Sequence, residues 1–456
     1  MKRVRQKVQI LGFAAAFPLL LLILIQSGLA DAASRQGGNT LPPFGYMGAA
    51  SNDTVAVFTV PTHTLSTTFS LLPEGDYPYD ATMTRDGHEV WVTGAIGDGV
   101  LVISTTSNTI VERFTTSPYG EYPVDVAFSE HGETAFISPR DNATGADKII
   151  LVDTASYSIT SSIPITSYYL GPGKMTVNHC TGELYVVNWY DDRFFVIDPT
   201  TQTVLHDLSI GTSMWDVVMN PTASLLYITD RGVDGVRVFN PATLVVSTTI
   251  PVGDDPWGID ITPDGRLIFV TNEDSHNVSV IDTATNSVIL TIPLAADADP
   301  RDVDISADGA YAYVTSGAIA GNDVVYVIDV ATLQLLPSID VSPASDPNVI
   351  AVAPPFASLD PIASFTSNSP VPPGTPIQFT DTTLNNPTSW VWDFGDGLGN
   401  STQQNPAYNY ANPGTYTVTL VTTNACGTDT FVDTVTVGTV TPPDIEVYLP
   451  MLIKED

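Results

Sequence analysis

The chain has 456 residues, enough for two or three domains with sizeable cores. Its 50 Asp and Glu residues outnumber its 16 Lys and Arg residues, and the formal net charge is −34. A surface of this sign repels nucleic acid phosphates and anionic lipids. The charge therefore excludes nucleic acid as an expected partner and leaves cations, basic partners and uncharged ligands. High solubility of an exported protein explains the same charge without any ligand.

The first 32 residues have the pattern of a secretory signal peptide. Four basic residues within the first seven positions precede an apolar run over 10–25, and Ala30-Asp31-Ala32 forms an A-x-A cleavage pattern. Pro18 interrupts the run, which is short for a membrane span, so we expect its removal. The mature chain is then expected to be secreted or held at the cell surface, with membrane contact only through the cleavable signal.

A strand of the type Val-x-Val-Ile-Asp, followed by a turn that contains Thr or Ser, recurs along the chain. Asp282-Thr-Ala-Thr285 is the clearest copy of the turn, and its side chains suit the position because they can bond the backbone two residues on. The seven copies cover residues 55–62, 100–107, 149–156, 194–201, 236–243, 278–285 and 325–332.

A second strand type, Pro-x-Asp-[Ile/Val], stands upstream of each later copy at spacings of 42 to 49 residues. Most copies lead into a tight turn such as Asp264-Gly265 and then into a Tyr-Val-Thr-Asn-like strand. With a Thr-rich outer strand, each unit has four strands, which is typical of a propeller blade. The copies begin at Pro78, Pro123, Pro172, Met214, Pro256, Pro300 and Pro347.

The first and last units are incomplete in complementary ways. The unit that starts at Phe44 lacks a Pro-x-Asp strand, and the unit at Pro347 has nothing else. Together they make one blade, which predicts a seven-bladed β-propeller over residues 44–355, closed by strands from both ends. The motifs resemble the YVTN-type β-propeller repeat family. This resemblance implies the fold and leaves the function open, because propellers host binding, adhesion and several enzymatic chemistries.

Residues 361–438 follow a proline-rich stretch and contain about seven short strand candidates, as a β-sandwich does. The segments WDFGDG (392–397) and PGTYTV (413–418) resemble the two best-known motifs of the PKD domain, an immunoglobulin-like module. The family implies an extracellular spacer or interaction module. The expected fold class is therefore all-β, a seven-bladed β-propeller followed by an immunoglobulin-like β-sandwich. Residues 439–456 form a Pro-containing tail without an assigned role.

Two sets of propeller loops lie on one face: those that lead into the inner strands, and those between the second and third strands. Both sets are rich in aromatic residues, which predicts a ligand-binding face, although packing between blades would explain any single residue. The candidate ligand-binding residues are Tyr79, Tyr122, Trp189, Trp215 and Trp257. The same loops also contain Tyr77, Tyr119, Tyr168, Tyr169 and Tyr190.

The third position of the Pro-x-Asp strands is acidic in four blades, at Asp80, Asp125, Asp216 and Asp302. If these strands are innermost, four carboxylates surround the channel mouth, where they would suit a hard cation such as Ca²⁺. No other cofactor is expected. The simpler interpretation, which we favour, is that the carboxylates cap loop backbone and that Lys174 neutralises a neighbour.

Catalytic patterns are missing, since the sequence has no HExxH, GxSxG or phosphate-binding glycine motif. Among the histidines, His276 falls in a loop of the ligand face, where we expect it to be solvated. We therefore expect a non-enzymatic binding or adhesion protein whose propeller face holds a carbohydrate or protein ligand at the cell surface. The second domain would be a spacer or a second contact. The alternatives are a metal-dependent hydrolase or lyase that uses the acid ring, and a self-assembling surface-layer component.

The two cysteines, Cys180 and Cys426, fall in different predicted domains. Two cysteines cannot form a disulfide scaffold, and neither belongs to a metal- or haem-binding spacing. Export would permit a bridge between them, but we expect them to remain unpaired.

Overall fold

The computed structural model describes residues 44–51, 53–60, 62–70, 77–94, 99–140, 147–165, 172–189, 192–318, 323–352, 360–385, 387–424 and 426–438. The predicted signal peptide and the tail 439–456 lie outside these residues, as do Tyr168, Tyr169 and Tyr190. In the described part of the chain there is no helix that is long and apolar enough to span a membrane.

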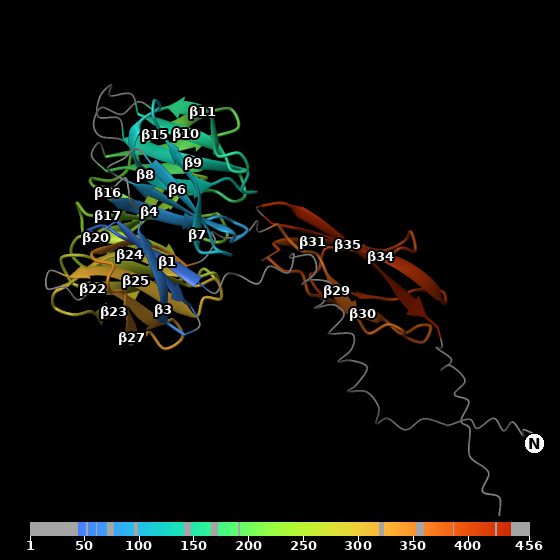
Figure 1. Cartoon of the computed structure of the whole chain (residues 1–456). Helices are drawn as coiled ribbons and strands as arrows, with labels where there is room; N and C mark the ends of the chain where they lie inside the picture. Colours follow the sequence, from blue (N-terminus) through green and yellow to red (C-terminus); the bar gives the residue numbers. More distant parts are fainter. Residues whose placement is uncertain are drawn as a thin grey trace, which may run out of the picture. The chain divides into compact units, whose positions relative to one another are not determined.

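Seven four-stranded antiparallel sheets, the blades, form most of the described chain (Figure 1). Blade 1 has β28 (Pro347–Ala351), β1 (Phe44–Ala49), β2 (Thr54–Thr59) and β3 (Thr64–Ser70). Blade 2 has β4 (Pro78–Met83), β5 (Glu89–Gly94), β6 (Gly99–Ser104) and β7 (Thr109–Thr115). Blade 3 has β8 (Glu121–Phe128), β9 (Thr134–Arg140), β10 (Lys148–Asp153) and β11 (Ser158–Pro164). Blade 4 has β12 (Pro172–Val177), β13 (Leu184–Asn188), β14 (Arg193–Asp198) and β15 (Thr203–Ser209).

The remaining three blades have the same order. Blade 5 has β16 (Met214–Met219), β17 (Leu226–Asp230), β18 (Gly235–Asn240) and β19 (Val245–Pro251). Blade 6 has β20 (Pro256–Ile261), β21 (Leu267–Asn272), β22 (Asn277–Asp282) and β23 (Ser287–Pro293). Blade 7 has β24 (Ala298–Ile305), β25 (Tyr311–Ala318), β26 (Val324–Asp329) and β27 (Gln334–Asp340). Each Pro-x-Asp segment lies in the first strand of its blade.

Blade 1 combines strands from the two ends of the propeller. β28 pairs antiparallel with β1, with Ile350 opposite Met47 and Val349 opposite Gly48. Figure 1 shows the blue strands of this blade next to the gold strands of blade 7. A ring closed in this way leaves β1 no open edge, because β28 pairs with it.

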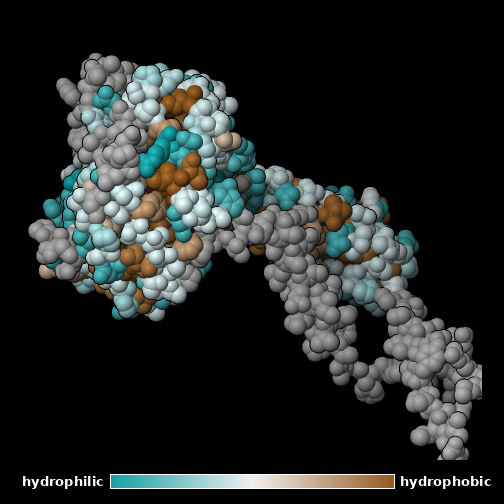
Figure 2. Space-filling view, viewed as in Figure 1, coloured by the Kyte–Doolittle hydropathy of each residue, from teal (hydrophilic) through white to brown (hydrophobic). Residues whose placement is uncertain are grey.

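The hydrophobic core lies between adjacent blades. One apolar cluster combines blade 1 with blade 2, another combines blade 7 with blade 1, and the other junctions repeat the arrangement. The second strands are buried along their whole length, as in β13 and β17, because neighbouring blades cover both faces. The outer strands alternate instead, and apolar residues on the face in Figure 2 form small patches separated by polar residues.

The turns from the first to the second strand lie on one face of the ring, which we call the turn face. Gly265 in such a turn has a φ of 72°, a left-handed conformation that glycine adopts without strain. The Asp-x-x-Thr turns have the expected backbone bonds, because Asp282 accepts from the amides of Ala284 (2.8 Å) and Thr285 (3.1 Å).

The C-terminal part is a two-sheet sandwich. One sheet has β29 (Phe365–Ser367), β30 (Ile377–Asp381) and β33 (Ala407–Tyr408), and the other has β32 (Asn400–Ser401), β31 (Ser389–Asp393), β34 (Gly414–Thr423) and β35 (Thr428–Val437). Trp392 and Phe394 of the WDFGDG segment lie in its core. The predicted fold class, a seven-bladed propeller followed by an immunoglobulin-like sandwich, is confirmed.

Candidate functional site

Aromatic residues from blades 2, 4, 5 and 6 meet on the face opposite the turn face. Trp189 and Trp215 stack with ring centroids 4.1 Å apart, and Trp257 lies 4.3 Å beyond Trp215. On the other side, Tyr79 stacks on Trp189 at 5.6 Å and Tyr77 lies 6.1 Å from Tyr79. We call these five residues the aromatic arc. Four of the five predicted ligand-binding residues therefore come together, and Trp189 shows that both predicted loop sets share one face.

Arginines cover the faces of these rings. The guanidinium carbon of Arg231 lies 4.6 Å from the centroid of Trp215 and 4.8 Å from that of Trp257. Arg140 lies over Tyr79 and Trp189 in the same way. Such contacts are favourable because the ring face is electronegative. These arginines are not among the residues predicted from the sequence, and the rarity of basic residues in so acidic a chain is the signal that could have indicated them.

Trp189 is the buried member of the aromatic arc. Its side chain is only 4% exposed, and its indole N–H donates to the carbonyl of Trp215 at 2.7 Å. Gly173 is required beneath it, because a Cβ there would lie 2.3 Å from the indole nitrogen. Trp189 therefore packs blade 4 against blade 5, which is the inter-blade packing alternative, and the partly exposed Tyr79, Trp215 and Trp257 remain the ligand candidates.

Tyr122, the fifth candidate, lies near the start of β8 and is partly buried. Its φ of 52° places a non-glycine residue in the left-handed region, which is uncommon and costs about 1 kcal/mol or more. The ring contacts that connect the other four candidates do not include it.

A cluster of carboxylates borders the arc at Trp257. Asp255 forms an ion pair with Arg231 and accepts from the Trp257 indole at 3.3 Å. Arg301 pairs with Asp299 at 2.8 Å and with Asp346 at 3.1 Å. These groups are partly exposed, so they can exchange hydrogen bonds with a bound ligand.

The titration of this cluster is shifted in both directions. Burial, together with a hydrogen bond to Asp299, raises the pKa of Glu273 to about 8. Burial also opposes ionisation of Asp255, but Arg231 prevails and lowers the pKa of that carboxyl. Glu273 is therefore a proton donor near neutral pH beside an ionised carboxylate.

The four predicted ring aspartates connect adjacent blades. The side chain of each accepts a hydrogen bond from a backbone amide in the first strand of the next blade. The acceptor–donor pairs are Asp80 with Val126 (3.3 Å), Asp125 with Met175 (2.6 Å), Asp216 with Ile259 (3.2 Å) and Asp302 with Ile350 (2.9 Å). The backbone-capping interpretation thus describes these carboxylates, and we call the bonds aspartate clasps.

Asp260 and Asp304 continue the clasps two residues further along their strands. Asp260 accepts from Ile305 at 2.8 Å, and Asp304 accepts from Val352 at 2.6 Å. Blade 6 uses this lower position because its third residue is Gly258, where a Cβ would lie 2.6 Å from the carbonyl oxygen of Arg301. The acidic residue two positions after Gly258 was the signal that could have predicted this.

Lys174 takes the third position in blade 4. Its ammonium pairs with Asp80 and lies 3.5 Å from Asp125, and the three side chains are at most 15% exposed. Burial alone would lower the pKa of Lys174, but Asp80 and Asp125 raise it well above its usual range. Burial raises the pKa of Asp216 to about 6 and that of Asp302 to about 7.

A cavity of about 210 Å³ lies in the channel below this layer. Its lining includes Lys174, the clasp aspartates of blades 2, 3 and 5, and, towards the turn face, Arg85 and His179. Oδ2 of each of these aspartates accepts a hydrogen bond from a backbone amide, and Lys174 provides a counter-charge. These side chains therefore connect neighbouring blades.

His276 is held in place by its loop. Its Nδ1 atom lies 2.6 Å from the carbonyl oxygen of Ala298, and its φ is 50°. The side chain is partly exposed, so it is solvated only in part, and its loop brings the ring against blade 7.

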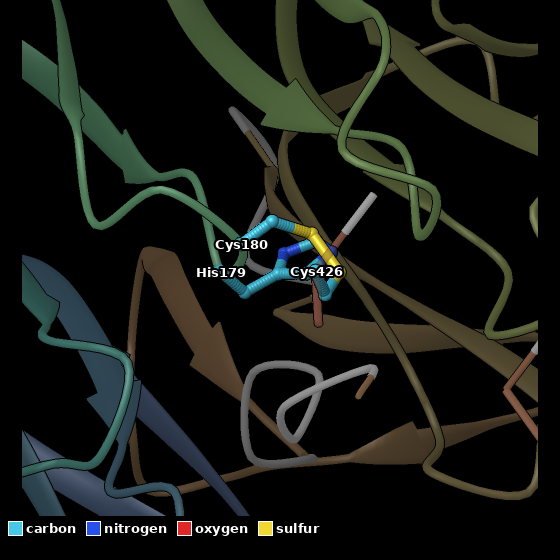
Figure 3. A group of neighbouring side chains, drawn as sticks. All are labelled: His179, Cys180 and Cys426. Atoms are coloured by element: carbon cyan, nitrogen blue, oxygen red, sulfur yellow. A yellow bond between two sulfur atoms is a disulfide. The ribbon is translucent and has the colours of Figure 1, made fainter. Parts of the chain in front are cut away.

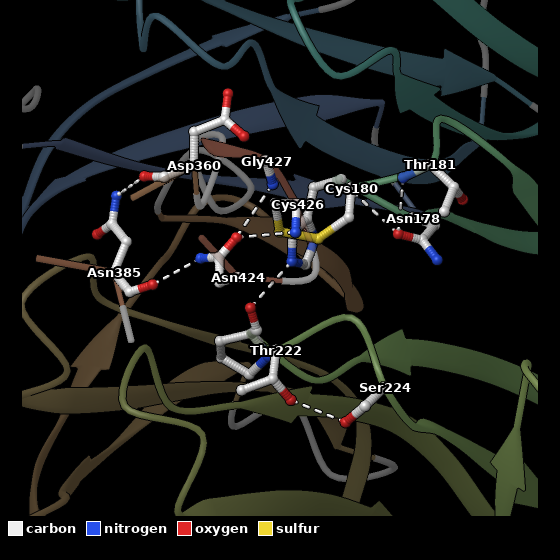
Figure 4. The surroundings of a disulfide bond; sticks show 12 residues. Asn178, Cys180, Thr181, Thr222, Ser224, Asp360, Asn385, Asn424, Cys426 and Gly427 are labelled. Carbon is white, nitrogen blue, oxygen red and sulfur yellow. Dashed lines mark hydrogen bonds between the residues drawn. A yellow bond between two sulfur atoms is a disulfide. The ribbon is translucent and has the colours of Figure 1, made fainter. Parts of the chain in front are cut away.

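The expectation that the cysteines remain unpaired is also wrong. Cys180 and Cys426 form a disulfide with a sequence separation of 246 residues (Figure 4). Sequence spacing does not report this proximity, because each cysteine lies in a turn whose position depends on the folded domains. His179 lies beside the bond, and the donor atoms of the three side chains fall within 4.8 Å of one another (Figure 3). The group is a poor metal site, because metals bind cysteine as the thiolate and both sulfurs are joined in the disulfide.

Comparison with known families confirms both resemblances. Residues 358–439 match the PKD domain, and residues 196–292 match the family described as "Lactonase, 7-bladed beta-propeller". No curated protein matches the chain significantly.

Solved structures with the same fold are distant in sequence. A functionally unknown protein from Desulfotomaculum acetoxidans DSM 771 has 15% identity and a TM-score of 0.58, over 69% of this chain and 99% of that chain. Hydrazine synthase from Kuenenia stuttgartiensis has 17% identity and a TM-score of 0.52, over 65% and 97%. The β-propeller domain of Cps50 (Swd1) from Myceliophteria thermophila has 11% identity and a TM-score of 0.51, over 67% and 93%.

These likenesses establish the fold alone. The chain combines a seven-bladed β-propeller with a PKD domain, and this architecture fits a surface or binding protein.

Proposed function

We propose that this protein is an exported binding or adhesion protein whose aromatic face holds a carbohydrate at the cell surface. The observation that carries the proposal is the aromatic arc, in which Tyr79, Trp215 and Trp257 from three blades meet beside partly exposed charged groups. Inter-blade packing accounts for Trp189, but it does not require charged groups around the exposed part of the arc.

The side chains around the arc suit a sugar ring. The apolar face of a pyranose would pack on the aromatic carbon that the arginines leave exposed, while Arg231, Asp255 and Glu273 offer planar donors and acceptors to its hydroxyl groups. The excess of carboxylates favours neutral or amino sugars over acidic ones. A basic peptide would use the same groups and is the alternative ligand.

Retention on insoluble polysaccharides and on cell envelopes, with and without Ca²⁺, tests the proposal. Trp257→Ala should weaken retention at least tenfold, because its ring is partly exposed and borders the carboxylate cluster. Trp390→Ala in the sandwich, a partly buried Trp whose indole bonds to Asp381 at 2.8 Å, is the matched control. If the wild type is not retained, or if both variants bind as it does, the proposal is wrong.

Trp189→Ala is unsuitable for this purpose. Its burial and its bond to Trp215 mean that the substitution would loosen blades 4 and 5, so loss of retention would not identify a ligand contact.

An enzyme, such as a lactone hydrolase, is the second candidate, and the family match over 196–292 favours it. The clasp aspartates are engaged by backbone amides, so Glu273, as a proton donor beside Arg231 and Arg301, is the better acid–base candidate. Ca²⁺ would enter only as a ligand of these carboxylates. Lactonase activity that is lost in Glu273→Gln and kept in Asp274→Asn would support this candidate, and sensitivity to a chelator would add the metal.

A further inference from the structure

The Cys180–Cys426 disulfide joins the propeller to the sandwich at one defined point of each (Figure 4). Cys180 lies in the turn between β12 and β13, and Cys426 lies in the turn between β34 and β35. The β12–β13 turn belongs to the turn face, which is opposite the aromatic arc.

The backbone leaves the propeller on this same face. Along β28, Pro347 pairs with Ala49 near the aromatic face, and Ala351 pairs with Tyr46 near the turns. The next residue, Val352, is still fixed, since its amide donates to Asp304. The eight peptide steps from Val352 to Asp360 can span at most about 28 Å.

Both connections also meet at one end of the sandwich. Asp360 lies directly against the turn with Cys426, because a Cβ at Gly427 would be 2.2 Å from its Oδ1 atom. The carbonyl of Asp360 accepts from the Asn385 side chain at 2.8 Å, and the carbonyl of Asn385 accepts from the Asn424 side chain at 2.7 Å (Figure 4).

An asparagine two residues before each cysteine shapes its turn. Asn178 accepts from the amide of Cys180 at 2.9 Å, and Asn424 accepts from the amide of Cys426 at 2.8 Å. Such Asx turns hold the cysteine backbone whether or not the sulfurs are bonded. His179 adds a contact between blades, with its Nε2 atom 3.0 Å from the carbonyl oxygen of Pro221.

We propose that the turn face of the propeller is a docking surface for the β34–β35 end of this chain's own sandwich. The linker and the disulfide are two separate tethers between the same face and the same end, so together they remove most of the rotational freedom that one linker would allow. The sandwich then acts as a fixed spacer on the turn face and leaves the aromatic arc free.

The covalent step needs a disulfide oxidant. The thiols of Cys180 and Cys426 lose two protons and two electrons as their S–S bond forms, and the oxidant takes up both as its own S–S bond becomes two thiols. Exported proteins meet such oxidants, whereas the cytoplasm keeps thiols reduced.

Cleavage of the full chain tests the tethers. A protease site introduced within residues 353–359 should, after cutting, leave one band on a gel without reductant and two bands with it. Cys180→Ser should give two bands in both lanes. Two titratable thiols per wild-type chain, or a disulfide between two chains, would overturn the proposal.

Hydrogen exchange tests the docking itself. Amides of the turns at 179–182 and 221–224 should exchange at least tenfold more slowly in the wild type than in Cys180→Ser/Cys426→Ser. The blade 7 turn at 307–310 is the internal control and should not change. Equal rates in both proteins would show that the sandwich is tethered without docking, and a loss of polysaccharide retention in the double variant would show that it is more than a spacer.

Discussion

At the scale of single residues, the channel aspartates provide the hydrogen bonds between the first strands of adjacent blades. First strands of adjacent blades converge on the axis without pairing, so their amides need other acceptors. An aspartate side chain places its oxygen one atom further from Cα than a backbone carbonyl does, and it reaches the next strand, as Asp302 does to Ile350. Burial raises the pKa of Asp125, and the nearby carboxylate of Asp80 raises it further. Lys174 offsets part of this repulsion with its positive charge.

Removal of the ammonium group at Lys174 should destabilise the ring. Lys174→Met leaves Asp80 and Asp125 buried without their counter-charge, which costs about 3 kcal/mol of unfolding free energy. Urea unfolding measures the change. Lys148→Met at the start of β10 is the control and should stay within about 0.5 kcal/mol. Adding Asp80→Asn and Asp125→Asn should restore part of the loss, and no restoration would argue against a charge effect.

Asp302 should make the stability of the protein depend on pH. Its pKa is raised from 3.8 in the unfolded chain to about 7 in the folded chain by burial, so its contribution is fully present below pH 3.8 and is lost as the pH rises through 7. Asp302→Asn keeps a carbonyl acceptor for Ile350 and removes this titration. Between pH 4 and 7 the fall in unfolding free energy should become shallower by up to about 1.4 kcal/mol per pH unit.

Denaturant unfolding at three pH values in this range measures the slope. The exposed Asp274→Asn is the control and should retain the wild-type slope. If Asp302→Asn also retains it, Asp302 is not the titrating group.

At the scale of strands, the threonine of the Tyr-Val-Thr-Asn segment makes a second series of bonds between blades. Thr271 Oγ1 accepts from the amide of Gly258 at 2.8 Å and donates to the carbonyl of Arg301 in the next blade at 2.8 Å. Thr229 and Thr315 repeat the arrangement. Blade 4 has Val187 at this position, and the indole of Trp189 reaches the equivalent carbonyl instead. Trp189 therefore makes the inter-blade hydrogen bond that Thr229, Thr271 and Thr315 make in their blades.

Thr271→Val should destabilise the protein by about 1–3 kcal/mol. Valine has the same shape, but it leaves a buried N–H and a buried carbonyl without partners. Thr291→Val on the exposed outer strand β23 is the matched control, with an expected change within about 0.5 kcal/mol. Thermal or urea unfolding of both variants decides, and equal effects would mean that the inter-blade bond is not the cause.

At the scale of the whole molecule, stability depends on closure of the ring. β28 contributes Val349 and Ala351 to the core between blades 1 and 2 and Ile350 to the core between blades 7 and 1, which Val352, the residue after β28, also joins. Without this strand, β1 would present an open edge and two inter-blade cores would be incomplete.

Two truncations that differ by one strand test closure. A chain that ends at Asp346 should aggregate or remain unfolded, while a chain that ends at Val352 should elute as a monomer with a cooperative melt. Size-exclusion chromatography and circular dichroism measure both. Both proteins lack Cys426, so the difference between them reports β28 and not the disulfide, and equal behaviour would contradict the closure argument.

The sequence by itself determined the architecture. Repetition at 42 to 49 residues places seven similar units in a ring, and the incomplete first and last units predict how the ring closes, because each unit must bury both faces against its neighbours. The same period assigns loops to faces, which is why Tyr79, Trp189, Trp215 and Trp257 could be predicted to lie on one face before any distance was known.

Only the tertiary structure decided what these residues touch. The repeat pattern predicts on which face Trp189 lies, but a shift of a few ångströms decides whether its ring contacts a ligand or the neighbouring blade. In the same way, the pattern predicts four carboxylates at the channel, but it does not show whether they bind a cation or backbone amides. The Cys180–Cys426 bond, the arginines over the arc and the raised pKa of Glu273 each join residues from different repeats or domains. A pattern along the chain records periodicity, whereas these contacts arise where the curvature of the ring and the path of the linker bring distant segments together.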